Sequence, residues 1–123
     1  MNRRLAVGSV LVLGFMLMPV AYAQPSTNVQ TEVNALLDLV GAAGCEFYRN
    51  GTWTNSKTAQ AHLRKKYTYL LENDLINSTE DFIEKEATKS SISGQPYEVR
   101  CDDGVRKTSK QWLLDELAHL RTF

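Results

Sequence analysis

Residues 82–101, FIEKEATKSSISGQPYEVRC, contain the strand on which the expected fold depends. The first part of this stretch is typical of a helix end, and its serine-rich middle contains the turn formers Gly94 and Pro96. The last part, Tyr97–Cys101, predicts a short strand. Because this strand ends on one of the two cysteines in the chain, the other, Cys45, indicates where its partner strand lies.

Cys45–Arg49 is the expected partner strand, and Asn50-Gly51, a strong turn pair, brings it to an end. Two cysteines in an oxidising compartment are expected to form a disulfide, and the alternative is a pair of reduced thiols in the core. The chain has no C-x-x-C spacing of the kind that lowers a thiol pKa, so a Cys45–Cys101 bridge is interpreted as structural.

The disulfide predicts a register if the two strands run antiparallel. Four pairs of residues then lie opposite each other: Phe47 and Val99, Arg49 and Tyr97, Glu46 and Arg100, and Tyr48 and Glu98. This register places apolar partners on one face and an opposite-charge pair on the other, which are favourable cross-strand combinations. Both the polarity pattern and the charges therefore agree with the predicted bridge.

Four segments carry apolar residues at helical spacing. They are expected to begin at Thr27 or Asn28, at about Ser56, at Ser78 or Thr79, and at Thr108 or Ser109. We expect the first to stop at Gly41 and Gly44, the second at about Glu72 and the third at Ser90-Ser91. With a further short strand at 105–107, the order predicts an α+β fold: about four helices packed on a small antiparallel β-hairpin or three-stranded sheet.

The first 23 residues have the layout of a secretory signal peptide. Arg3 and Arg4 precede an apolar run, Leu5–Met18, and the small-residue tripeptide Ala21-Tyr22-Ala23 predicts cleavage after Ala23. The alternative is a transmembrane anchor, because the uncharged stretch approaches the length of a membrane span. The first interpretation predicts an exported, periplasmic protein with no membrane anchor after cleavage, in which residues 24–123 form a single small globular domain.

Charge and histidine spacing argue against several classes of function. The formal net charge is zero, so there is no basic field to bind nucleic acid. The two histidines, His62 and His119, lie far apart in the sequence and no acidic residues cluster with metal-ligand spacing. We therefore expect neither a metal nor a cofactor.

Two functional hypotheses remain. A small hydrolase would use His62 with a serine of the Ser90–Ser93 turn, although the chain has no G-x-S-x-G signature. A binding protein would use aromatic side chains with polar tips, among which Trp53 is expected to be partly exposed, to contact a peptide or saccharide. The edges of strands Cys45–Arg49 and Tyr97–Cys101 would also suit a partner strand.

Three segments, FYRNG at 47–51, AHLR at 61–64 and SSISGQPYEV at 90–99, resemble the YfeK-like family of small exported bacterial proteins. The resemblance covers most of residues 24–123 and supports export, but the family brings no established activity, ligand or catalytic residue. The binding candidates within these segments and beside them are Arg49, Asn50, His62, Lys66, Ser91, Ser93 and Tyr97.

We expect the turn around Ser93-Gly94 to pack near the helix of His62 and to form one polar patch with it. The alternative is that these residues only hold the turn and the hairpin together. Taken as a whole, the sequence predicts a non-enzymatic binding or interaction protein of the bacterial envelope, whose partner is an envelope protein, a peptide or a saccharide.

Overall fold

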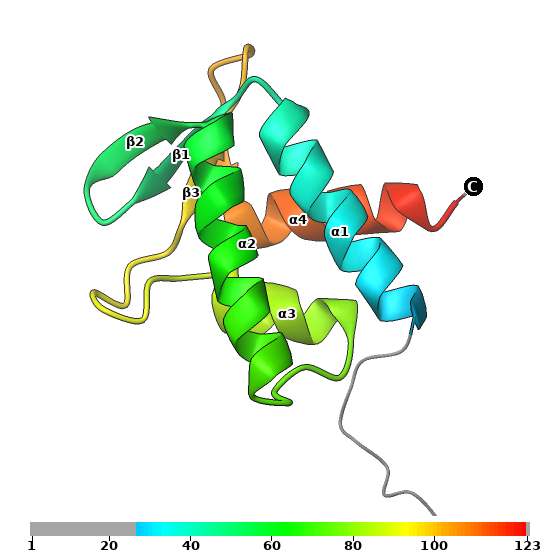
Figure 1. Cartoon of the computed structure of the whole chain (residues 1–123). Helices are drawn as coiled ribbons and strands as arrows, with labels where there is room; N and C mark the ends of the chain where they lie inside the picture. Colours follow the sequence, from blue (N-terminus) through cyan, green and yellow to red (C-terminus); the bar gives the residue numbers. More distant parts are fainter. Residues whose placement is uncertain (1–26, 123) are drawn as a thin grey trace, which may run out of the picture.

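Four helices and a four-stranded sheet make up the part of the chain that the computed structural model describes, residues 27–122 (Figure 1). The helices are α1 (Thr27–Ala42), α2 (Ser56–Glu72), α3 (Thr79–Glu86) and α4 (Ser109–Leu120). The strands are β1 (Glu46–Arg49), β2 (Thr52–Asn55), β3 (Glu98–Arg100) and β4 (Arg106–Thr108). The predicted α+β class is confirmed. The predicted signal peptide lies outside the described residues, and no described helix is long and apolar enough to cross a membrane.

The sheet is antiparallel with the strand order β2-β1-β3-β4. In the central pair, β1 and β3, Glu46 lies opposite Arg100 and Phe47 lies opposite Val99. Next to this pair, Cys45 and Cys101 form a disulfide. The bridge and three of the four expected pairs are therefore confirmed, whereas Tyr97 lies before β3 and its expected pairing with Arg49 is not part of the sheet. Arg100 donates two hydrogen bonds to the Glu46 carboxylate.

The structure extends the expected hairpin or three-stranded sheet by one edge strand, β2. Asn50 and Gly51 both have positive φ, 51° and 86°, as the tight turn of a two-residue hairpin requires. The signal for β2 in the sequence is the Asn-Gly pair followed by Thr52, Trp53 and Thr54, which are residue types that favour strands. The expectation that β1 and β3 offer open edges is wrong, since both are inner strands and the edges are β2 and β4.

Helix α3 ends at Glu86, earlier than the expected end at Ser90-Ser91. After the helix, the chain makes bonds that a longer helix would lose. The hydroxyl of Thr88 donates to the carbonyl of Ile83, and the backbone amide of Tyr97 donates to the carbonyl of Thr88. The loop 87–97 therefore doubles back on itself and delivers the chain into β3, and Lys89 and Pro96 form an isolated β-bridge within it.

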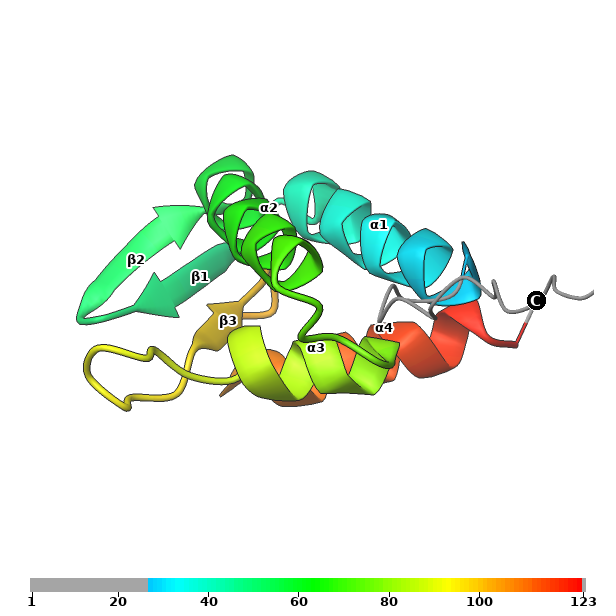
Figure 2. The same ribbon diagram turned by 60° about the horizontal axis from the view of Figure 1, so that its bottom comes forward.

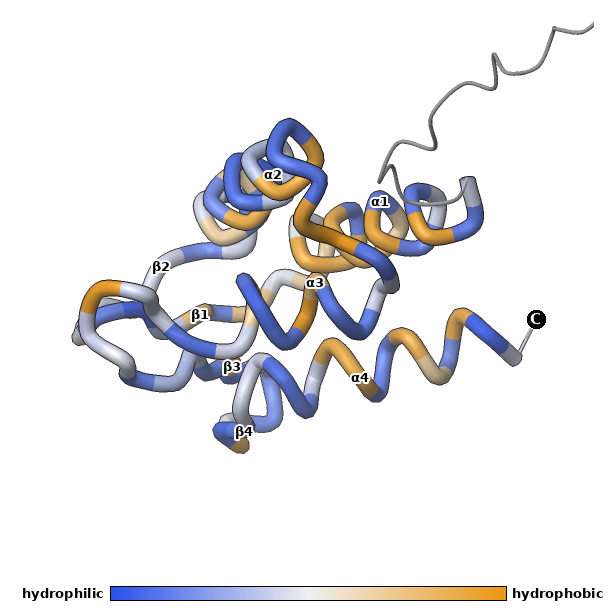
Figure 3. Tube along the Cα trace, turned by 90° about the horizontal axis from the view of Figure 1, so that it is seen from below, coloured by the Kyte–Doolittle hydropathy of each residue, from blue (hydrophilic) through white to orange (hydrophobic). Residues whose placement is uncertain are grey.

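The four helices enclose the core together with one face of the sheet. In Figure 2, α1 and α2 lie above α3 and α4, and the strands stand at one end of this pair of layers. Apolar stretches alternate with polar ones along each helix in Figure 3, as expected for helices with one buried face. The largest fully buried side chains are Phe82, Leu36, Leu37, Leu70, Ile76 and Ile83. Phe47 joins this core from the sheet, packed edge-on against Trp112.

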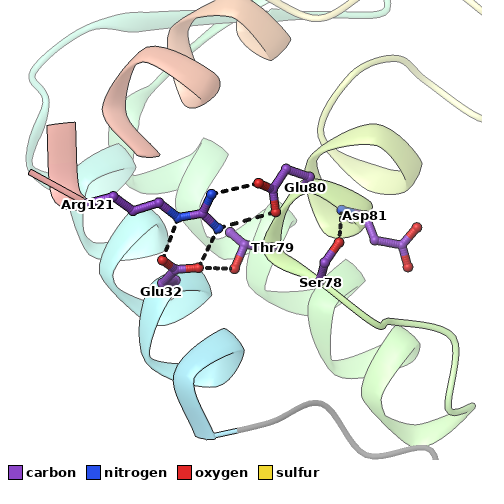
Figure 4. A network of polar contacts seen from close by, with 6 residues as sticks. All are labelled: Glu32, Ser78, Thr79, Glu80, Asp81 and Arg121. Atoms are coloured by element: carbon purple, nitrogen blue, oxygen red, sulfur yellow. Dashed lines mark hydrogen bonds and ion pairs between the residues drawn. The ribbon is translucent and has the colours of Figure 1, made fainter. Parts of the chain in front are cut away.

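A polar cluster links three helices (Figure 4). It lies at the C-terminal end of α4, which is on the side opposite the strands in Figure 2. Glu32 of α1 accepts hydrogen bonds from Arg121, at the end of α4, and from the hydroxyl of Thr79 in α3. Arg121 also pairs with Glu80 of α3. The hydrogen bonds from Arg121, and then from Thr79, lower the pKa of Glu32 to about 2. The sequence offered no signal for this contact, because its members are far apart in the chain.

The lowered pKa of Glu32 makes the cluster sensitive to acid. A carboxylate with a lower pKa in the folded than in the unfolded state stabilises the fold above the unfolded pKa and loses that contribution as the pH falls. We therefore expect the Glu32 contribution to be lost between about pH 5 and pH 2. Glu32→Gln should lower the free energy of unfolding at pH 7 by about 1–3 kcal/mol and flatten this part of the pH profile, measured by urea unfolding. An unchanged profile in the variant would contradict the assignment.

Candidate functional site

A small cavity, partly open to solvent, lies between β1, α2, the start of α4 and the end of the loop that precedes β3. Five apolar side chains contribute to its wall: Phe47, Ala59, Leu63, Ala87 and Leu113. Its volume is about 30 Å³, which is room for about two water molecules. Arg49, His62 and Tyr97 line it as well. Three of the seven binding candidates therefore share one cavity, which we call the His62 cavity.

A chain of polar contacts runs beside the His62 cavity. The Lys66 ammonium donates a hydrogen bond of 2.7 Å to the Tyr97 hydroxyl and lies 3.5 Å from a carboxylate oxygen of Glu86. The same hydroxyl lies 3.5 Å from Nε2 of His62. Because this oxygen accepts from Lys66, its own proton is free to point to the imidazole, which favours a neutral His62 protonated on Nδ1.

The side chain of Lys66 differs from its expected position. Its spacing on α2 predicts a largely solvent-facing side chain, but Lys66 is half-buried, with its ammonium 5.0 Å from the centre of the Tyr97 ring. The Tyr97 ring is buried, as the sequence suggests for this residue. Glu86, which balances the charge of Lys66, was not among the candidates, because its acidic neighbours in the sequence gave it the pattern of a solvated helix face.

Arg49 is the candidate whose surroundings are least expected. Its side chain is half-buried, lines the His62 cavity and, among residues 27–122, has neither a hydrogen bond nor an ion pair. A half-buried guanidinium is normally paired, because removing its charge from water costs free energy. Arg49 therefore leaves a positive charge available to an anion at the cavity.

The environment of His62 keeps it neutral. Partial burial, and then the positive charges of Arg49, Lys66 and Lys65, lower the pKa of His62 to about 4. At pH 7 the imidazole therefore carries one N–H donor and one acceptor nitrogen. Since Lys66 is balanced by Glu86, the net positive field at the cavity comes from Arg49 and the exposed Lys65.

The pKa of His62 yields a measurable prediction. The pKa of His62 is lower in the folded protein, about 4, than in the unfolded chain, about 6.5. The protein therefore loses stability as the pH falls from about 6.5 to about 4, because only the unfolded chain takes up a proton on His62 in this range. In an NMR titration, the His62 ring resonance should move with a midpoint near pH 4. Arg49→Gln removes one repelling charge and should shift the midpoint upwards. A midpoint that stays in place in Arg49→Gln would show that the guanidinium does not face the imidazole.

Asn50 and Ser93, two of the remaining candidates, hold the turn that borders this region, and Ser91 does not take part. The hydroxyl of Ser93 donates to the carboxamide oxygen of Asn50 at 2.6 Å, which ties the loop 87–97 to the β1–β2 turn. Ser91 is exposed and, in the described part of the chain, has no hydrogen-bond partner. The structure therefore groups the candidates into two contacts, Asn50 with Ser93 and the residues around His62. A single patch that joins Ser93 to His62 stays a prediction.

The hydroxyls of Ser90 and Ser93 are engaged in the structure of the turn. The buried hydroxyl of Ser90 accepts hydrogen bonds from the backbone amides of Ile92 and Ser93. Within residues 27–122, the polar partner of the His62 ring is Tyr97, not a serine. Over the same residues, no three histidine, cysteine, aspartate or glutamate side chains gather as a metal site would require.

The outer face of the sheet carries a second group of candidate contacts. Trp53 is half-buried there, as expected, next to Tyr48 with ring centres 5.3 Å apart. The guanidinium groups of Arg100 and Arg106 lie 4.0 and 5.3 Å from the centre of the Trp53 ring. Each of these arginines is paired with a glutamate, so this face has its charges satisfied internally.

The fold and the cavity define a small disulfide-bonded α+β protein with a half-buried, unpaired arginine. Residues 27–121 match the family described as "Family of unknown function (DUF5329)", and the chain belongs to this family. It is 34% identical over 87 residues to the "Uncharacterized protein YfeK" of Salmonella typhimurium (strain LT2), covering 70% of this chain and 71% of that protein. No solved structure gives a significant match. The resemblance to the YfeK-like family is thus confirmed.

Proposed function

We propose that this protein is an exported, periplasmic binding protein of the bacterial envelope, and that its ligand occupies the His62 cavity. The segment before residue 24 supports export, and the Cys45–Cys101 disulfide is of a kind that forms and persists in oxidising compartments such as the periplasm. The protein acts without a cofactor and without nucleic acid. Its partner is a small envelope-derived molecule, such as a peptide or saccharide.

One observation carries the proposal: the half-buried guanidinium of Arg49 has no partner among the described residues although it lines an apolar cavity. A concave, mainly apolar site with a few convergent polar groups is typical of ligand pockets. In such a site an unpaired charge is the group that a ligand of opposite charge would satisfy.

Thermal unfolding tests the proposal. The low-molecular-mass filtrate of a bacterial envelope extract should raise the Tm of the wild-type protein, because a ligand that binds only the folded state stabilises it. Arg49→Gln should abolish the rise. Arg64→Gln is the matched control, because Arg64 is an arginine on α2 that is not part of the cavity wall and pairs instead with Asp38. The proposal fails if the filtrate leaves Tm unchanged or acts equally on Arg49→Gln.

Export is tested separately. When the full chain is expressed in a bacterium, the periplasmic fraction should contain a protein that begins at Gln24, as measured by intact mass. Retention of the whole chain in the cytoplasm or in the membrane fraction would contradict this part of the proposal.

The second hypothesis, a hydrolase that uses His62 and a serine of the Ser90–Ser93 turn, predicts a different result. An active-site serine probe would label the wild-type protein, and Ser91→Ala or Ser93→Ala would remove the label. The engagement of Ser93 with Asn50 and of His62 with Tyr97 favours the binding function, for which no labelling is expected.

A further inference from the structure

We propose that the His62 cavity binds a carboxylate that carries a small apolar group, as at the alanine end of a short peptide, with Arg49 pairing the carboxylate and the apolar wall receiving the methyl group. This inference rests on the proposed binding function and names the class of its ligand. It follows from charge, from donor geometry and from size.

Charge at the cavity selects an anion. Lys66 is balanced by Glu86, whereas neither Arg49 nor Lys65 has a carboxylate partner among residues 27–122. The field from these two cations is felt inside the cavity, because both lower the pKa of His62. Binding an anion there would pair the half-buried guanidinium of Arg49, so the free energy spent on its partial burial would be recovered.

The donor set suits a carboxylate. A guanidinium presents its N–H groups as a planar fork that matches the two oxygens of a carboxylate. Besides Arg49, the cavity wall offers the neutral imidazole of His62, with one N–H donor, whereas the Tyr97 hydroxyl already points its proton to that imidazole. Among the residues that line the cavity only Arg49 carries a charge, because the exposed Lys65 is not part of the wall, and one guanidinium fits a singly charged ligand better than a phosphate dianion.

Size restricts the apolar part of the ligand. The cavity holds about 30 Å³ between side chains such as Phe47, Leu63 and Leu113. A cavity of about 150 Å³ accommodates a benzene ring, so this one is too small for a phenyl group and admits a group about as large as a methyl. An alanine side chain beside a carboxylate meets both requirements.

The cluster around Tyr97 would keep this arrangement in place. Its hydroxyl is fixed by Lys66, and its ring packs edge-on against His62 with ring centres 6.1 Å apart. The hydrogen bond between Ser93 and Asn50 fixes the turn directly after Arg49. Because both contacts already order the site, binding would cost less conformational entropy.

NMR titration of the isotope-labelled protein with defined probes tests the inference. N-acetyl-alanine should shift the side-chain resonances of Arg49 and His62 in a saturable manner. N-acetyl-alanine amide, which lacks the charge, should bind about ten- to a hundred-fold more weakly, and N-acetyl-phenylalanine should bind more weakly because its ring exceeds the cavity. Propionate and alanyl-alanine separate a free monocarboxylate from a peptide end: alanyl-alanine should bind more tightly than propionate, and equal binding would overturn the assignment to a peptide end.

Arg49→Gln should weaken binding of N-acetyl-alanine by the same ten- to a hundred-fold, whereas Arg64→Gln should leave it unchanged. Equal binding of the acid and its amide, or of the phenylalanine derivative, would overturn the inference. If none of the probes binds although envelope filtrate raises Tm in an Arg49-dependent manner, the ligand class is wrong and the proposed function stands. If the filtrate has no effect either, both are wrong.

Discussion

The double variant Cys45→Ala/Cys101→Ala is expected to lose roughly 4 kcal/mol of unfolding free energy. The bridge links residues 56 positions apart, so it removes much conformational freedom from the unfolded chain. It also joins the ends of β1 and β3, the two central strands. Since a domain of this size has a net stability of about 5–15 kcal/mol, the loss would be a large share of the total.

Urea unfolding of the oxidised wild type and of the double variant measures this effect. Reduction of the wild-type protein should lower its stability by a similar amount, whereas the variant should not respond to reductant. Glu46→Gln is the control, because its exposed pair with Arg100 lies on the same two strands and is worth at most about 1 kcal/mol. A double variant as stable as the wild type would show that the sheet does not depend on the bridge.

Tyr97→Ala should be the most damaging single substitution near the site, at about 3–5 kcal/mol, a cost typical of removing a buried aromatic ring. The ring is 6% exposed and lies against His62 and the Lys66 ammonium. Its loss would leave a void between α2 and the loop 87–97 and would release Lys66 from its hydrogen bond. The same change should abolish binding at the His62 cavity.

Tyr97→Phe separates the contribution of the ring from that of the hydroxyl, and Tyr69→Ala is a control for removing an exposed tyrosine. Tyr97→Phe keeps the ring and should cost about 1 kcal/mol, the usual worth of one hydrogen bond. Tyr69→Ala removes a tyrosine that is 56% exposed and should change the free energy of unfolding by less than about 0.5 kcal/mol. Thermal and urea unfolding of the three variants give the comparison. A Tyr97→Ala protein as stable as Tyr97→Phe would mean that the ring is not part of the core.

The sequence predicts the central strand pair because several independent signals agree on it. The two cysteines, the apolar partners Phe47 and Val99, and the charges of Glu46 and Arg100 each require the same register. The helices are predictable for a similar reason, since a buried face repeats with the helical period and caps such as Asn55, Ser78 and Thr108 mark the starts.

The sequence does contain a local signal for strand β2, because Asn50-Gly51 is a hairpin turn and the residues after it, Thr52, Trp53 and Thr54, favour strands. The polar cluster around Arg121 depends instead on contacts between distant residues. The pairing of Arg121 with Glu32 and Glu80 joins helix positions that look like ordinary solvated surface.

The sequence predicts some residues of the candidate site but not their charge balance. Arg49, His62, Lys66 and Tyr97 are candidates from the sequence, and the structure brings them together around one cavity and the polar chain beside it. What the sequence cannot show is that Lys66 is balanced by Glu86 while Arg49 is left without a partner. The pairing of Lys66 arises from the packing of α3 against α2, and the unpaired charge of Arg49 is the basis on which we propose an anionic ligand.

An isotope-filtered NOE spectrum of the labelled protein with unlabelled N-acetyl-alanine tests the central claim most directly, because it locates the ligand as well as detecting it. If the methyl group enters the His62 cavity, its resonance will show NOEs to the side chains of Leu63 and Leu113, and these will vanish in Arg49→Gln. NOEs to the outer face of the sheet around Trp53, or none at a saturating concentration of the ligand, would contradict the account.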